Sequence, residues 1–134
     1  MQNRRGPEHP GMSDGSRIWL IPDAYMPAAG PPGPYQGHES LCVLNTGTAE
    51  ASISLAFYFA DRPAVKDVRI RVGGERCLHV RFDRPEMLGG FVVPREIPYG
   101  LRVESDVPVV VQHSRLDVTQ ANMAFLSVVG HPRG

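Results

Sequence analysis

Short apolar runs with an alternating pattern follow one another along the chain. In the segment Ala51–Phe59, the residues Ile53, Leu55 and Phe57 fall on one side, and small or polar residues fall on the other. Successive side chains of a β-strand point to opposite faces, so a period of two residues is typical of a strand with one buried face. The pattern predicts a strand whose apolar face belongs to the core.

Turn-forming residues separate further segments of this kind, at the spacing expected of an antiparallel sandwich or barrel. The 13 prolines and 14 glycines break almost every window of helical length. We therefore predict an all-β protein, built as a two-sheet antiparallel β-sandwich of about eight short strands. The predicted strands are Arg17–Ile21, Glu39–Asn45, Ala51–Phe59, Asp67–Val72, Arg76–Phe82, Leu101–Glu104, Val107–Ser114 and Asn122–Val129.

A β-hairpin is predicted around the loop Gly73-Gly74-Glu75. A three-residue loop pairs Ile70 with Leu78 and Val68 with Val80, which keeps the apolar residues of both strands on one face. One glycine of the loop is expected in the left-handed region. The residues expected to face the core are Leu55, Phe57, Leu78 and Val80.

The opposite face of this predicted hairpin is basic. Its residues are Arg69, Arg71, His79 and Arg81. Exposed guanidinium groups can bind carboxylate, phosphate or a neighbouring subunit. The simpler alternative is a solvated outer face with cross-strand pairs, such as Asp67 opposite Arg81.

The length of 134 residues fits one domain. Residues 1–16 are rich in Gly, Pro and charge and are predicted to be a disordered arm; residues 17–130 form the sandwich domain, and residues 131–134 a tail. The 14 Lys and Arg balance the 14 Asp and Glu, so no overall field attracts nucleic acid or an anionic membrane. With no apolar run of membrane-span or signal-peptide type and two isolated cysteines, a cytoplasmic protein is expected.

Common catalytic motifs are missing from the sequence, including GxSxG, GxxxxGK[ST] and HExxH. We therefore expect no enzyme, no catalytic residues and no cofactor. His38, His79 and His113 lie in or beside predicted strands, but none has the H-x-H spacing by which one strand presents two imidazoles to a metal. No metal site is expected.

The proline-rich segment of residues 26–37 is a candidate binding loop, because prolines preorganise it at low entropic cost. Aromatic and hydrogen-bonding groups are concentrated around it. The predicted ligand site, for a sugar or a small anionic ligand, uses the groups beside this loop and an arginine for negative charge. Its residues are Tyr25, Tyr35, His38, Glu39, Arg81 and Arg115.

Several segments together resemble the sensory rhodopsin transducer family. They are Ile18-Trp19, Tyr25-Met26-Pro27, His38-Glu39, the Leu44-Asn45-x-Gly47 turn, His79-Val80-Arg81-Phe82, and the run Val107–Asp117 with Gln120. The resemblance covers about residues 17–129, and the run VPVVVQHSRLD is its most specific part. It implies a small cytoplasmic β-sandwich that assembles as a homotetramer and couples to a membrane sensory rhodopsin.

The function implied by this resemblance is that of a non-enzymatic signalling adaptor that acts through oligomeric assembly and partner binding. The family's sandwich is also similar to carbohydrate-binding modules, so a carbohydrate- or small-ligand-binding module is the second hypothesis. A DNA-binding regulator is the third, since the charge is balanced and no recognition helix is visible.

Overall fold

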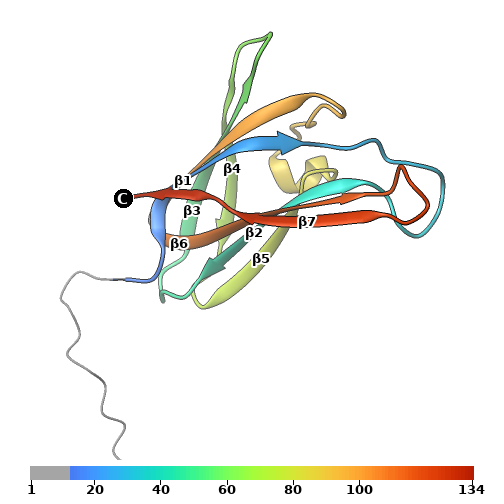
Figure 1. The fold of residues 1–134 in the computed structure, drawn as a ribbon. Coiled ribbons are helices and arrows are strands. Elements are labelled where there is room, and N and C mark those ends of the chain that lie inside the picture. Colours follow the sequence, from blue (N-terminus) through green and yellow to red (C-terminus); the bar gives the residue numbers. More distant parts are fainter. Residues whose placement is uncertain (1–12) are drawn as a thin grey trace, which may run out of the picture.

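One long strand, β6 (Pro98–Asp117), organises the fold. Its first half pairs with β1 (Ser16–Tyr25) and β3 (Ala51–Phe59), and its second half pairs with β2 (His38–Asn45) and β7 (Ala124–Val129). The computed structural model describes residues 13–134, which form a two-sheet antiparallel β-sandwich (Figure 1). Because β6 belongs to both sheets, it carries the chain from one layer to the other.

The remaining elements are β4 (Val65–Val72), β5 (Arg76–Arg81), the 3-10 helix η1 (Pro85–Leu88) and β8 (His131–Arg133). Sheet I has the strand order β4-β3-β6-β1-β8, and sheet II has the order β5-β2-β6-β7. The predicted fold class is thereby confirmed.

The core lies between the inner faces of the two sheets, and its centre is aromatic. The Phe57 ring packs at centroid distances of 5.5, 4.9 and 5.5 Å from the rings of Phe82, Phe91 and Tyr99. Such tilted aromatic contacts add to the stabilisation from burial alone. Of the residues predicted to face inward, Leu55, Phe57 and Val80 are fully buried, and Leu78 packs partly buried against the core.

The predicted hairpin between β4 and β5 is wrong. β4 pairs with β3, placing Ile70 opposite Ile53, whereas β5 pairs with β2, placing Leu78 opposite Val43. The Gly73–Glu75 connection therefore passes from sheet I to sheet II. Alternation shows which side of a strand is buried, but both strands can bury that side in the same core from opposite sheets.

The turn itself also differs from the prediction. Glu75 has a positive φ of 53°, whereas neither Gly73 nor Gly74 does. Gly74 is needed for a different reason: a Cβ atom there would lie 2.1 Å from the carbonyl oxygen of Thr48. The backbone N–H of Glu75 donates to the carbonyl of Gly47 at 2.8 Å, so two turns pack directly against each other.

The single basic face predicted from that hairpin is likewise wrong, because its residues lie on different sheets. Arg69 and Arg71 are on the outside of sheet I, and each lies near a carboxylate, Asp67 at 3.6 Å and Glu50 at 3.7 Å respectively. His79 and Arg81 are on the outside of sheet II. The partner of Arg81 is Asp83, at 2.7 Å, and not Asp67.

Two predicted strands, Leu101–Glu104 and Val107–Ser114, are parts of the continuous strand β6. Pro108 lies between the parts of β6 that pair with β3 and with β2, and within the register shift of the ladder with β1, so its missing N–H removes no bond from a regular ladder. Most of the predicted arm, residues 1–12, lies outside the described residues, and β1 begins at Ser16. The predicted tail instead contributes β8, which pairs with β1 (Figure 1).

Candidate functional site

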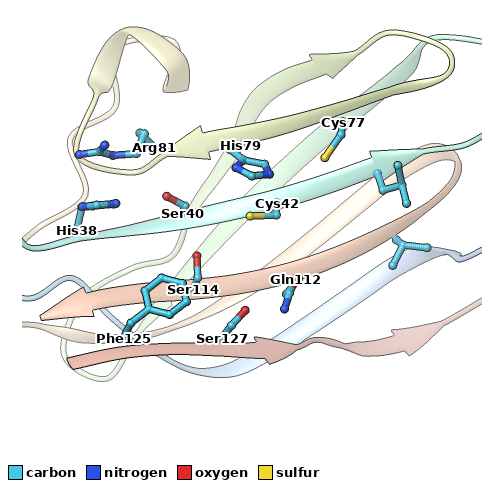
Figure 2. Close-up of a pocket in the computed structure, with 12 residues that line it drawn as sticks. His38, Ser40, Cys42, Cys77, His79, Arg81, Gln112, Ser114, Phe125 and Ser127 are labelled. Atoms are coloured by element: carbon cyan, nitrogen blue, oxygen red, sulfur yellow. The ribbon is translucent and has the colours of Figure 1, made fainter.

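Strand β2 divides the predicted ligand site into two parts. Its residues alternate between the core and the outer face of sheet II, with Glu39, Leu41 and Val43 pointing inward. His38 and Ser40 point to the outer face, where they line a hollow (Figure 2). His38 and Glu39 were predicted to share one site, but as neighbours in a strand they face opposite ways.

The inner part is a buried polar cluster centred on the Glu39 carboxylate. Its Oε2 atom accepts a hydrogen bond of 2.8 Å from the backbone N–H of Tyr25. The hydroxyl of Tyr99 donates to Oε1 at 2.5 Å, and the Nε2 atom of His113 lies 3.0 Å from Oε2. Glu39 and His113 are fully buried, so solvent does not reach the carboxylate.

Arg115 completes this group, which we call the Glu39 cluster: Tyr25, Glu39, Tyr99, His113 and Arg115. Its Nη2 atom lies 3.6 Å from Oε2 of Glu39, and its guanidinium carbon lies 5.6 Å from the centroid of the Tyr25 ring. The structure thus brings together three predicted site residues, Tyr25, Glu39 and Arg115.

Tyr99 and His113 were not predicted to belong to this site. Both lie on β6, but in different sheets, and they meet at Glu39 because β6 crosses between the layers. In the ladder between β2 and β6, Glu39 is opposite Arg115 and Leu41 is opposite His113. That register depends on a long-range pairing that alternation in the sequence does not reveal.

The protonation of the Glu39 cluster follows from its surroundings. Burial alone would raise the pKa of Glu39, but His113, the Tyr99 hydroxyl and the Tyr25 N–H together outweigh burial, so its pKa lies below the ordinary 4.5. Burial raises the pKa of Tyr99 well above 10.0, and the negative charge of Glu39 adds to that shift. Near neutral pH the carboxylate is therefore ionised and the phenol is protonated, as the hydrogen bond between them requires.

The outer part of the predicted site is a hollow of about 720 Å³ on the outside of sheet II, which we call the outer trough (Figure 2). It crosses β5, β2, β6 and β7. Its lining residues are His38, Ser40, Cys42, Leu44, Cys77, His79, Arg81, Val110, Gln112, Ser114, Phe125 and Ser127.

The strand register arranges these residues in rows across the trough. One row consists of Arg81, Ser40, Ser114 and Ser127, in that order from β5 to β7. The next row contains His79, Cys42 and Gln112. Ser40 and Ser114 are only 8% and 9% exposed although they face outward, because small side chains form the floor and longer ones form the rim.

His38 and Arg81 lie at one end of the trough (Figure 2). The Nδ1 atom of His38 lies 2.8 Å from the carbonyl oxygen of Gln36, which can only accept, so Nδ1 donates. The guanidinium of Arg81 donates through Nε and Nη2 to both carboxylate oxygens of Asp83, at 2.8 and 2.7 Å. Arg81 is therefore held in place with its charge balanced.

Tyr35 belongs to neither part. It is 61% exposed on the segment of residues 26–37, which forms no strand, as predicted. The base of this loop is closed by Arg95, whose guanidinium donates to the carbonyls of Pro27 and Gly37 at 2.7 and 2.9 Å. Sequence reasoning did not identify Arg95, because its role depends on contacts between distant segments.

Two further findings concern the chemistry of the described residues. Within residues 13–134, no three His, Cys, Asp or Glu side chains are arranged to hold a metal ion. No helix in the same range is both long and apolar enough to cross a membrane.

The chain was compared with known proteins. The family model described as Anabaena sensory rhodopsin transducer matches residues 14–132. A solved structure described as Thermotoga maritima 1070 is 37% identical with a TM-score of 0.80, covering 90% of this chain and 97% of that chain. The Anabaena sensory rhodopsin transducer is 30% identical with a TM-score of 0.63, covering 76% of this chain and 84% of that chain. No curated protein matches. The match over nearly the whole chain shows that this protein belongs to the Anabaena sensory rhodopsin transducer family.

Proposed function

We propose that the protein is a non-enzymatic signalling adaptor that acts through homo-oligomeric assembly and partner binding. Membership of the transducer family supports the signalling role. The observation that carries the assembly role is the edge strand β7. This strand pairs with β6 on one side, and no strand within residues 13–134 pairs with its other edge.

Strand β7 lacks the features that protect an exposed edge. All residues of Ala124–Val129 are exposed, and the segment contains neither charge nor proline. Its apolar side chains lie on both faces, with Phe125 and Val129 on the outer face and Leu126 and Val128 on the other. Natural edge strands are usually blunted by charges, prolines or bulges, so an apolar edge of this kind fits a strand that is covered in an assembly.

The occupant that we propose for this edge is β7 of a second copy. Two identical edges can pair antiparallel about a two-fold axis and extend sheet II across both subunits. The homotetramer implied by the family then needs a second contact. An apolar hollow of about 350 Å³ on the outside of sheet I, which includes Leu20, Tyr58 and Leu101, is a candidate for it.

The assembly can be tested by light scattering coupled to size-exclusion chromatography. We expect the wild type to be larger than a monomer at micromolar concentration. Val129→Lys should weaken assembly at least tenfold, because a charged residue on an edge strand opposes edge-to-edge pairing. Val92→Lys is the matched control, since Val92 is 66% exposed and Val129 is 68% exposed. A monomeric wild type, or equal effects of both variants, would contradict the proposal.

The proposed partner is a membrane sensory rhodopsin, because the Anabaena relative is by its name the transducer of such a receptor. We place the adaptor in the cytoplasm, where Cys42 and Cys77 remain thiols. The test is binding of the purified protein to a sensory rhodopsin from the same organism, reconstituted in nanodiscs. Affinity that changes at least threefold on illumination is the expected result, and no binding in either state would overturn the proposed partner.

A further inference from the structure

We propose that one end of the sandwich is a docking surface for the interface of a lipid bilayer. Two loops project together beyond the sheets at this end, the loop between β1 and β2 and the turn between β6 and β7 (Figure 1). Their outermost residues, 30–36 and 119–123, are exposed throughout. We call these residues, together with Phe125 near the start of β7, the neutral tip. A bilayer is soft, so it can accept a projecting surface that matches no rigid groove.

The composition of the neutral tip is unusual for a soluble surface. The tip contains no Asp, Glu, Lys, Arg or His, although 21% of the chain is charged. Ordinary surfaces carry charge on about a quarter to a third of their residues. The large side chains of Tyr35, Met123 and Phe125 are all exposed there, and three prolines lie beside them. Exposed apolar patches of this kind mark sites that meet a protein or a membrane.

The lack of charge favours a bilayer over a protein as the occupant. A charged side chain is costly to move into lipid, whereas aromatic side chains such as Tyr are enriched at the interface of a membrane. Protein interfaces usually have a polar rim and are enriched in Arg, and the neutral tip provides no guanidinium. Because no charge takes part, the contact should need neither anionic lipid nor low salt.

The backbone of the tip limits how deeply it can enter lipid. Unpaired N–H and C=O groups are not tolerated in the hydrocarbon region, where no water is present to bind them. Pro31, Pro32 and Pro34 have no N–H, so the first loop carries few unpaired donors. Its carbonyl groups still need partners. We therefore expect the tip to rest at the level of the headgroups, as other interfacial segments do.

Contacts behind the tip hold the first loop in shape. The Arg95 guanidinium bridges the carbonyls at its two ends, and the backbone N–H of Gly37 donates to the carbonyl of Ala29 at 2.9 Å. Gly30 has a φ of 81° and lies against Val118, where a Cβ atom would be only 2.5 Å from the Val118 side chain. The two loops are therefore fixed to each other, and docking costs little conformational entropy.

The turn between β6 and β7 presents Met123 in a rarely adopted backbone conformation. Its φ is 42°, in the left-handed region that few residues other than Gly occupy. The backbone N–H of Met123 donates to the carbonyl of Gln120 at 3.1 Å, which closes the turn. Such strain is often retained at functional positions, and here it accompanies an apolar side chain that stays exposed.

Flotation of the purified protein with phosphatidylcholine vesicles that contain no receptor tests the proposal. We expect at least about a third of the protein to float with about 3 mM lipid, since interfacial binding through a few apolar groups is weak and reversible. Adding about 30% phosphatidylglycerol, or about 0.5 M salt, should change the bound fraction less than twofold.

Tyr35→Trp places a fluorescent reporter at the tip. Its emission should shift to the blue by about 5 nm or more when vesicles are added, because Trp prefers the membrane interface. The native Trp19 is buried, and its Nε1 atom donates to the carbonyl of Val109 at 2.9 Å, so its emission should stay constant. Tyr58→Trp is the control, because it makes the same change at an exposed position of β3 outside the tip.

Charge variants locate the surface. Tyr35→Glu should weaken vesicle binding at least tenfold, because it places a charge at the membrane interface, whereas Tyr35→Phe should preserve binding. Tyr58→Glu is the matched control and should change binding less than twofold. Circular dichroism verifies that each variant is folded under the conditions of the assay.

The proposal is overturned if the wild type does not float, if it binds only anionic vesicles, or if the two Glu variants bind alike. It is also overturned if receptor-free vesicles bind nothing while Tyr35→Glu weakens binding to nanodiscs that hold the rhodopsin, because the tip would then dock on protein. The vesicles contain no receptor, so a failure here leaves the adaptor proposal to its own test.

Discussion

The two sides of β2 use polar residues in opposite ways. On the inner side, the Glu39 carboxylate is fully buried, and the backbone of β1 and two residues of β6 supply its close partners. On the outer side, Ser40 and Ser114 are shielded on the floor of the trough, and they line an open hollow in place of the core. A buried polar group stabilises a fold only when its partners are in place, whereas a binding site needs groups whose partners are still to come.

The comparison also assigns roles to adjacent residues. Glu39 connects β1, β2 and both halves of β6, so it links the two sheets through one carboxylate. The ring of His38, one residue earlier, lies on the outer face and hydrogen-bonds to the backbone carbonyl of Gln36. Changes on the inner side should therefore alter stability, and changes on the outer side should alter binding.

The largest effect is expected from Glu39→Gln. The substitution keeps the size of the side chain but removes its negative charge. That charge compensates Arg115 and is the one that the donors of the cluster surround. Breaking a buried charged network in this way costs about 3–5 kcal/mol of the free energy of unfolding. Urea denaturation monitored by circular dichroism measures it.

His38→Gln is the control for this prediction, because it changes the adjacent residue on the other side of β2. We expect a loss below about 0.5 kcal/mol, as for most surface substitutions. Similar losses for Glu39→Gln and His38→Gln would show that the two sides do not differ in the way proposed.

Tyr99→Phe should have a smaller effect. The variant keeps the ring in the aromatic core but removes the hydroxyl that donates to Oε1 of Glu39. A buried acceptor left without its donor costs about 1–3 kcal/mol. Tyr58→Phe makes the same change at an exposed position of β3 and should leave the unfolding free energy almost unchanged. If both variants melt like the wild type, the hydrogen bond from Tyr99 to Glu39 does not contribute to stability as predicted.

The Glu39 cluster should also make stability depend on pH. The pKa of Glu39 is lowered in the folded protein, so its contribution is complete above 4.5 and is lost as the pH falls below that value. The pKa of Tyr99 is raised, so its contribution is complete below 10.0 and is lost as the pH rises beyond it. The difference in unfolding free energy between wild type and Glu39→Gln should shrink below pH 4.5. A constant difference down to pH 3 would exclude this role for Glu39.

Alternation in the sequence was sufficient to predict strands and buried faces. Leu55, Phe57 and Val80 are buried as predicted, and the bounds of β3 match those predicted from the pattern. Which strands pair with each other was harder to predict, as the incorrect hairpin between β4 and β5 shows. A period of two residues identifies the inward side of a strand, but it carries no information about which distant strand lies beside it.

The candidate site shows the same limit. Tyr25, Glu39 and Arg115 were predicted together and do meet, whereas His38 and Arg81 lie on the other side of sheet II. The separation of His38 from Glu39 follows from alternation alone and was overlooked in favour of their closeness in sequence. The hydroxyl row of the trough could not be predicted, because it depends on the registers of β2, β6 and β7.

The smallest expected effect on stability comes from changing the two thiols of the trough, whose reaction rates should nevertheless differ. Cys77 is exposed, whereas Cys42 is partly buried on the floor, and burial raises the pKa of its thiol despite a contact with Ser114. Because the thiolate is the reactive form, Cys42 should react with an aromatic disulfide reagent at pH 8 at least tenfold more slowly than Cys77. Rates measured separately in Cys77→Ser and Cys42→Ser assign the two phases, and neither variant should change the unfolding free energy by more than about 0.5 kcal/mol. Equal rates would mean that the floor of the trough is as open to solvent as its rim. Ser40 and Ser114 would then be no more shielded in solution than ordinary surface serines.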